Sequence, residues 1–150
     1  MAESQPLTDA ERPKLRVLRA LLFGIGAELL TILSIVLAVM VYRLGGHTAA
    51  DIDHFSAQAG LVIGPAGGAI YTFVMAMASL RGVSARFVTH GLLVAAGAVA
   101  FHLLGVTHAP GGFQPIYLYA DLAKLIAGVL AGIVAARTGG NAAALPRVQP

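Results

Sequence analysis

The sequence has no cysteine and no tryptophan, and only 11% of its 150 residues are charged. Without cysteine, the chain has no disulfide, no cysteine-ligated metal cluster and no thiol nucleophile. The patterns of common enzyme sites are also missing, among them the Gly-x-Ser-x-Gly nucleophile elbow, the zinc-binding His-Glu-x-x-His and the phosphate-binding P-loop. These absences argue against an enzyme, and a small integral membrane enzyme is only the third interpretation.

Long apolar runs dominate the sequence. Hydrophobic residues make up 57% of the chain, and its mean hydropathy is +0.80. One soluble domain of this size could not keep so much apolar surface out of water. Four runs, at residues 17–42, 57–80, 87–106 and 116–136, are each long enough for a membrane-crossing helix of about 20 residues. Because lipid requires backbone groups to pair within each segment, the predicted fold is an all-α bundle of four transmembrane helices.

Basic residues between these runs predict the orientation of the chain. Only Arg43 flanks the runs on one side, whereas the other side has Arg12, Lys14, Arg16, Arg19, Arg81, Arg86, Arg137 and Arg147. Arginine and lysine concentrate on the cytoplasmic side of membrane proteins, so both termini are expected there, in a plasma (inner) membrane. We expect a polar N-terminal tail over 1–16, a transmembrane domain over 17–136 and a disordered tail over 137–150. The helix-end charges explain the basic pI, so nucleic acid is not an expected partner.

Small residues recur at helical spacing in two of the runs. Gly60, Gly64 and Gly68 are each four residues apart in the second run, and Gly128 and Gly132 repeat this spacing in the fourth. Residues at this spacing lie on one face of a helix, where a second backbone can approach closely. The pattern predicts close helix packing, either within one chain or between copies in a homo-oligomer.

Four ionisable residues lie inside the apolar runs: Glu28, His102, Asp121 and Lys124. An ionisable side chain at the centre of a membrane helix costs about 2.5 to 3.5 kcal/mol, so each needs a partner or must be neutral. Asp121 and Lys124 are three residues apart on one helix and are expected to pair, and His102 lies at a depth comparable with Asp121. These four residues are the candidates for a transport pathway. The alternative is that they serve only helix assembly.

Histidines outside the centres of the spans suggest further sites. His47, Asp51 and His54 would share one helical face if the outer connection, 44–56, were helical, which gives a weak prediction of a divalent-metal site. His90 follows Arg86 by one turn and is expected at the cytoplasmic interface, within reach of lipid headgroups. Haem is not expected, because no second span provides a histidine at the depth of His102.

Two functional classes fit these patterns. The first is a transporter or channel-like protein that moves a small solute, an ion or a proton through an oligomeric helical bundle. The second is a non-transporting membrane subunit or scaffold whose buried polar residues hold helices together. The expected partners are the lipid bilayer and either further copies of the chain or other subunits of a membrane complex.

Overall fold

The computed structural model describes residues 16–108 and 113–143, and within these residues the chain is helical with no strand. Its helices are α1 (Val17–Leu44), α2 (Ala49–Ser79), α3 (Phe87–Thr107) and α4 (Pro115–Ala143). All four are long and apolar enough to cross a membrane. The prediction of an all-helical chain with four helices of membrane-spanning length is therefore confirmed.

Two helices extend further than the apolar runs that predicted them. α2 begins at Ala49, so the expected outer connection over 44–56 is mostly helical. Its start is fixed by a capping box, in which the Asp51 backbone N–H donates to Thr48 Oγ1 and the Thr48 backbone N–H donates to the Asp51 carboxylate. α4 continues through Ala143, so residues 137–143 are helical rather than part of the expected tail. The remaining tail residues, 1–15 and 144–150, lie outside the described residues.

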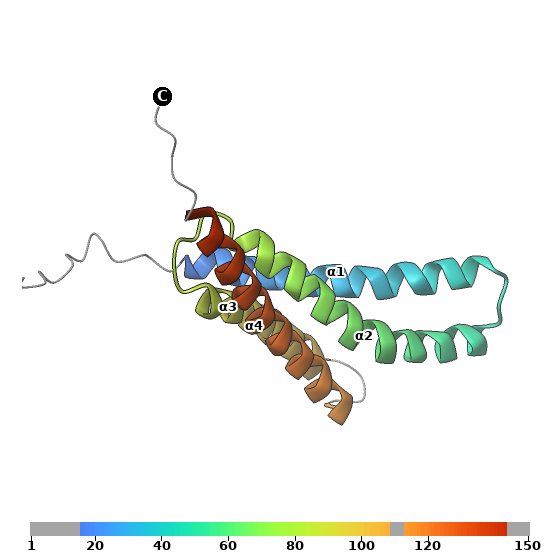
Figure 1. Cartoon of the computed structure of the whole chain (residues 1–150). Coiled ribbons are helices and arrows are strands. Elements are labelled where there is room, and N and C mark those ends of the chain that lie inside the picture. The colour runs from blue at the N-terminus through green and yellow to red at the C-terminus, as the bar shows by residue number, and fades with distance from the viewer. Residues whose placement is uncertain (1–15, 109–112, 144–150) are drawn as a thin grey trace, which may run out of the picture.

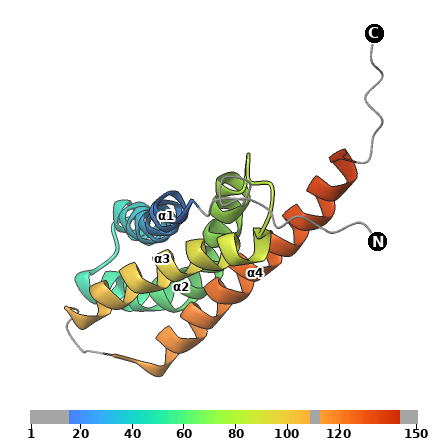
Figure 2. The ribbon, with the colours of Figure 1, turned by 90° about the vertical axis from the view of Figure 1, so that its left-hand side faces the viewer.

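The four helices form two antiparallel hairpins that pack together at one end and diverge toward the other (Figure 1). Around the bundle, α1 packs on α2, α2 on α4, α4 on α3 and α3 on α1, while α2 also touches α3 across the centre. α3 thus lies between α1 and α4 (Figure 2). The other two helices that face each other across the bundle, α1 and α4, make no close backbone approach within the described residues.

Glycines allow α3 to approach both α4 and α1 closely. A Cβ atom on Gly128 would lie 2.5 Å from the carbonyl oxygen of Gly91, and one on Gly132 would lie 2.5 Å from Cα of Val88. On the α1 side, a Cβ on Gly97 would lie 2.6 Å from the carbonyl oxygen of Leu21. Gly128 and Gly132, the glycine stripe of α4, therefore pack within the chain against the backbone of α3.

Gly60, Gly64 and Gly68, the glycine stripe of α2, differ in whether another side chain lies close to them. A Cβ on Gly68 would meet the side chain of Lys124, but no atom lies within 4 Å of the Cβ position at Gly60 or Gly64. Most of this stripe therefore does not pack against another helix of the same chain.

The outward faces of the helices are apolar. On α4, large side chains at every fourth position are exposed, namely Leu118, Leu122, Ile126, Leu130 and Val134. A soluble protein would not leave so continuous an apolar face uncovered, whereas lipid tails would solvate it. The exposed surface therefore agrees with four apolar helices in a membrane.

Candidate functional site

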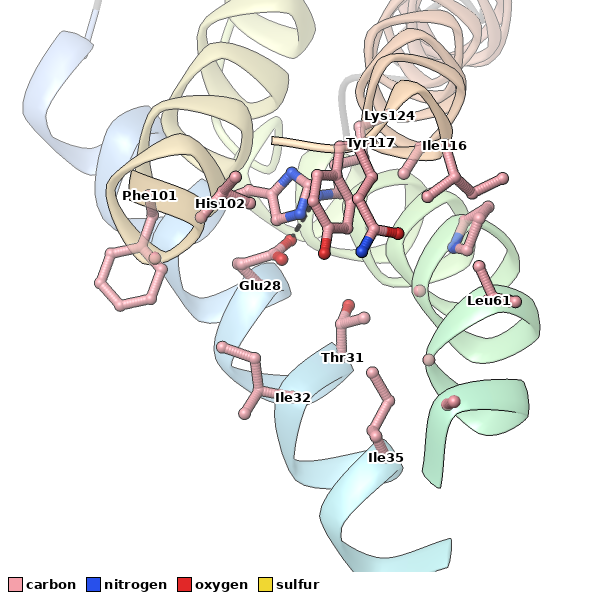
Figure 3. Close-up of a pocket in the computed structure, with 18 of the residues that line it drawn as sticks. Glu28, Thr31, Ile32, Ile35, Leu61, Phe101, His102, Ile116, Tyr117 and Lys124 are labelled. Atoms are coloured by element: carbon pink, nitrogen blue, oxygen red, sulfur yellow. Dashed lines mark ion pairs between the residues drawn. The ribbon is translucent and has the colours of Figure 1, made fainter. Parts of the chain in front are cut away.

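A cavity of about 480 Å³ lies between the two hairpins where they diverge, and all four helices contribute to its lining. Figure 3 shows its side chains. Most of the wall is apolar and includes Ile32, Ile35, Leu61, Phe101, Val106 and Ile116. On the α2 side, Gly60 and Gly64 border this open space, which explains why no atom lies near their Cβ positions.

Lys124 of α4 lines the deep end of the cavity, and its side chain is only 1% exposed. Its Nζ lies 2.8 Å from a carboxylate oxygen of Glu28 on α1 and 3.3 Å from Oδ1 of Asp121. The aliphatic part of the lysine passes over Gly68, where a Cβ would lie 2.8 Å from its Cε atom. The missing side chain at Gly68 thus makes room for Lys124 to extend from α4 to α1.

His102 of α3 joins the same cluster through Asp121. Its Nδ1 lies 2.6 Å from Oδ1 of Asp121, the oxygen that also accepts from Lys124. Such a short contact is typical of a charge-assisted hydrogen bond. The His102 ring also packs edge-on against Tyr117, with ring centres 5.5 Å apart. All four predicted pathway residues are therefore connected, and we call Glu28, His102, Asp121 and Lys124 the charge cluster.

The members of the charge cluster differ in how deeply they are buried. Exposure of the side chain falls from 17% for His102 through 10% for Asp121 and 5% for Glu28 to 1% for Lys124. A buried ammonium is tolerated only when carboxylates compensate it, and here it has two. Two ionised carboxylates and one ammonium leave the cluster with one net negative charge while His102 is neutral. Protonation of His102 makes the cluster neutral.

Sequence reasoning found the members of this cluster but not all of its contacts. The Asp121–Lys124 pair follows from spacing on one helix, and His102, predicted at a depth comparable with Asp121, contacts it. The closer partner of Lys124 is Glu28, on a helix that α4 does not touch. Gly68 was predicted as a helix contact, whereas its neighbour is the lysine side chain. Both contacts depend on how the helices are rotated about their axes, which spacing within one helix does not determine.

His90 is not exposed to lipid headgroups as predicted. Its side chain is fully buried, and neither ring nitrogen has a hydrogen-bond partner among the described residues. The expectation considered only depth along α3. Close packing of Gly91 against Gly128, and of Gly132 against Val88, brings α4 against this turn of α3 and leaves His90 inside the bundle.

The predicted metal ligands are used in other ways. His47 precedes α2 and stacks on Tyr42, with ring centres 3.9 Å apart, while Asp51 caps the start of the helix. His54 lies on α2 itself, so His47 and His54 do not share one helical face. Among residues 16–108 and 113–143, no three histidine, aspartate or glutamate side chains are gathered in a way that could hold a metal ion.

Comparison with known proteins adds no family to these observations, because no family model, curated protein or solved structure matches the chain.

Proposed function

We propose that the chain is a membrane transport protein that binds a small solute or ion in the cavity between its hairpins. The observation that carries this proposal is that Glu28, His102 and Lys124 of the charge cluster line a cavity of about 480 Å³, while Asp121 contacts two of them from outside the lining. Pockets for small molecules commonly measure about 300 to 1,000 Å³. Ionisable residues inside membranes are costly and often mark substrate or ion pathways. Helix assembly alone would explain the ion pairs but not the cavity beside them.

The proposed orientation places both termini in the cytoplasm. Arg16, Arg19, Arg81, Arg86 and Arg137 all belong to the end of the bundle where the hairpins converge, whereas Arg43 lies at the end of α1, beside the connection to α2. By the positive-inside rule, the converging end faces the cytoplasm. The cavity then opens toward the opposite side of the membrane, the outside of the cell if this is a plasma (inner) membrane.

Transport requires that the cavity close on one side and open on the other. Such a change is commonly a rigid movement of one helical unit against another around a fixed site. The two hairpins are suitable units, and the Glu28–Lys124 pair links the two helices that do not pack together, α1 and α4. Substrate binding that weakens this pair would therefore loosen one link between the hairpins, which also contact each other through α1 on α3 and α2 on α4.

A second candidate function is a non-transporting subunit or scaffold. The observation that favours it is the open face of α2, where nothing lies within 4 Å of the Cβ positions of Gly60 and Gly64. A helix from a second copy, or from another subunit, could pack on this face and fill the cavity. In that case the charge cluster would serve only to hold the helices in register.

Ion flux across vesicles separates the two functions. Purified protein would be reconstituted into liposomes, and proton and K⁺ flux followed with internal dyes after a gradient of either ion is imposed. A protein with an ion pathway through this cavity carries at least one of these ions, and Glu28→Gln, which cannot carry a proton, abolishes proton flux while the protein still assembles. Val74→Leu, on the exposed face of α2, serves as the control. Correctly folded wild-type protein that carries neither ion would contradict an ion pathway and favour the scaffold.

A further inference from the structure

We propose that the cavity binds a monovalent organic cation with an apolar body, and that this cation replaces a proton held by the His102–Asp121 pair. This inference deepens the proposed function and rests on it for the location of the site. It follows from the charge of the cluster, the order in which its members are buried and the composition of the cavity wall.

Charge balance is the first step. With His102 neutral, Glu28 and Asp121 outweigh Lys124 by one negative charge. Inside a membrane an unbalanced charge is costly, so the cluster is stabilised by one added positive charge. A proton on His102 supplies that charge, and so does a cation in the cavity. Because only one positive charge is needed, the proton and the cation compete.

The order of burial is the second step, and it favours a cation over an anion. An anion would need the ammonium of Lys124, but this group is the most deeply buried of the four, with Glu28 and Asp121 at 2.8 and 3.3 Å. Glu28, His102 and Lys124 all line the cavity, but the ammonium is already paired with carboxylates, whereas Glu28 and His102 are less deeply buried. Tyr117 lies in the same lining beside His102, and an aromatic ring next to a bound cation would stabilise it.

The wall of the cavity is the third step, because it defines the rest of the ligand. A bare monovalent metal ion would leave most of about 480 Å³ empty. The side chains around that space are mainly aliphatic or aromatic, and the uncharged polar groups among them are those of Thr31, Ser56, Gln114 and Tyr117. An amine or quaternary ammonium compound with an apolar group of moderate size would match both the charge at the deep end and the apolar wall.

The charged groups around His102 support the replacement of a proton by a cation at this residue. From α4 it faces Asp121 and Tyr117, and through Asp121 it is coupled to Lys124. α1 contributes Glu28 to the same cavity. The α2 part of the wall, Ser56, Ala57, Gly60, Leu61, Gly64 and Pro65, contains no titratable side chain. The negative charges next to His102 are thus those of the charge cluster itself.

The test is calorimetric binding of two probes of similar size and opposite charge, benzyltrimethylammonium and benzenesulfonate, to the full chain in detergent or nanodiscs. We expect the cation to bind at one site with release of about one proton, measured in buffers of different ionisation enthalpy. Its affinity should fall as the pH is lowered, by up to about tenfold per pH unit, and benzenesulfonate should bind at least about tenfold more weakly.

Two variants that change the net charge of the charge cluster separate loss of charge from loss of folding. Glu28→Gln makes the cluster neutral and should weaken cation binding by at least about tenfold. Glu28→Gln combined with Lys124→Met restores the single negative charge without leaving a buried ammonium unpaired, so cation binding should return to within about threefold of wild type. Failure of the well-folded double variant to recover binding would overturn the charge-balance argument, as would tighter binding of benzenesulfonate to the wild type.

The outcomes also separate this inference from the proposed function. Cation binding with proton release, but without proton flux in liposomes given a gradient of benzyltrimethylammonium, would support the ligand class and contradict transport. Flux that depends on Glu28, together with no binding of the cation or preferential binding of the anion, would support transport and overturn the ligand class.

Discussion

Lys124 pairs with Glu28 across the diagonal of the bundle along which α1 and α4 make no direct backbone contact within the described residues. The ammonium reaches the carboxylate, at 2.8 Å, because Gly68 of α2 leaves the path of the lysine side chain free. One glycine, one lysine and one glutamate from three helices therefore form the link across this diagonal. The first two predictions concern this link.

Gly68→Ala should destabilise the protein, whereas Gly60→Ala should not. A Cβ at position 68 would lie 2.8 Å from Lys124 Cε and would displace the ammonium from Glu28, while the same atom at position 60 meets nothing within 4 Å. We expect Gly68→Ala to lower the free energy of unfolding by about 1 to 3 kcal/mol. Gly60→Ala should be neutral or stabilising by up to about 1 kcal/mol, because alanine favours a helix. Denaturant unfolding in mixed micelles measures both, and equal stability of the two variants would show that the lysine is not held at Gly68.

Removing both carboxylates should cost far more than removing either one. Asp121→Asn alone leaves Glu28 at 2.8 Å from the ammonium, so the variant should still assemble. Glu28→Gln combined with Asp121→Asn leaves a buried ammonium without a counter-charge, at an expected cost of about 3 to 5 kcal/mol. Addition of Lys124→Met should then recover assembly. Expression level and monodispersity on size-exclusion chromatography provide the measurement, and a triple variant as poorly assembled as the double one would refute the ion-pair interpretation.

Labelling of single cysteines tests the proposed orientation. Ala49 and Ser84 are both exposed, at opposite ends of the bundle. Because the chain has no native cysteine, each substitution gives one reactive thiol. An impermeant maleimide should label Ala49→Cys in intact cells and should label Ser84→Cys only after the membrane is permeabilised. The reverse pattern would show that the termini lie outside.

Gly64→Leu tests whether the open face of α2 contacts another chain. No atom of the same chain lies within 4 Å of the Cβ position at Gly64, so a larger side chain there should not disturb the monomer. If a second copy packs on this face, the variant should lose association in lipid, as measured by cross-linking or single-molecule photobleaching. Val74→Leu, on the exposed face, should behave as wild type. Unchanged association of Gly64→Leu would exclude this face as a subunit contact.

Sequence reasoning predicted the features that depend on a single helix. It missed contacts that depend on how several helices are rotated about their axes. Apolar runs identified the helices, and three-residue spacing identified the Asp121–Lys124 pair. The start of α2 was missed although Thr48 and Asp51 have capping-box spacing, because the apolar run begins later. The link from Lys124 to Glu28 and the burial of His90 required the positions of neighbouring helices, which depend on glycine contacts between residues far apart in the sequence.

Transport through the cavity is tested most directly by blocking it at Gly60. Gly60→Cys places a thiol on the α2 wall, and Val74→Cys places one on the exposed face of the same helix. Each variant, reconstituted in liposomes, would be treated with a benzyl methanethiosulfonate, and ion flux would be measured before and after complete modification. We predict that modification abolishes flux in Gly60→Cys and leaves it unchanged in Val74→Cys and in the cysteine-free wild type. Full flux through completely modified Gly60→Cys would contradict transport through this cavity.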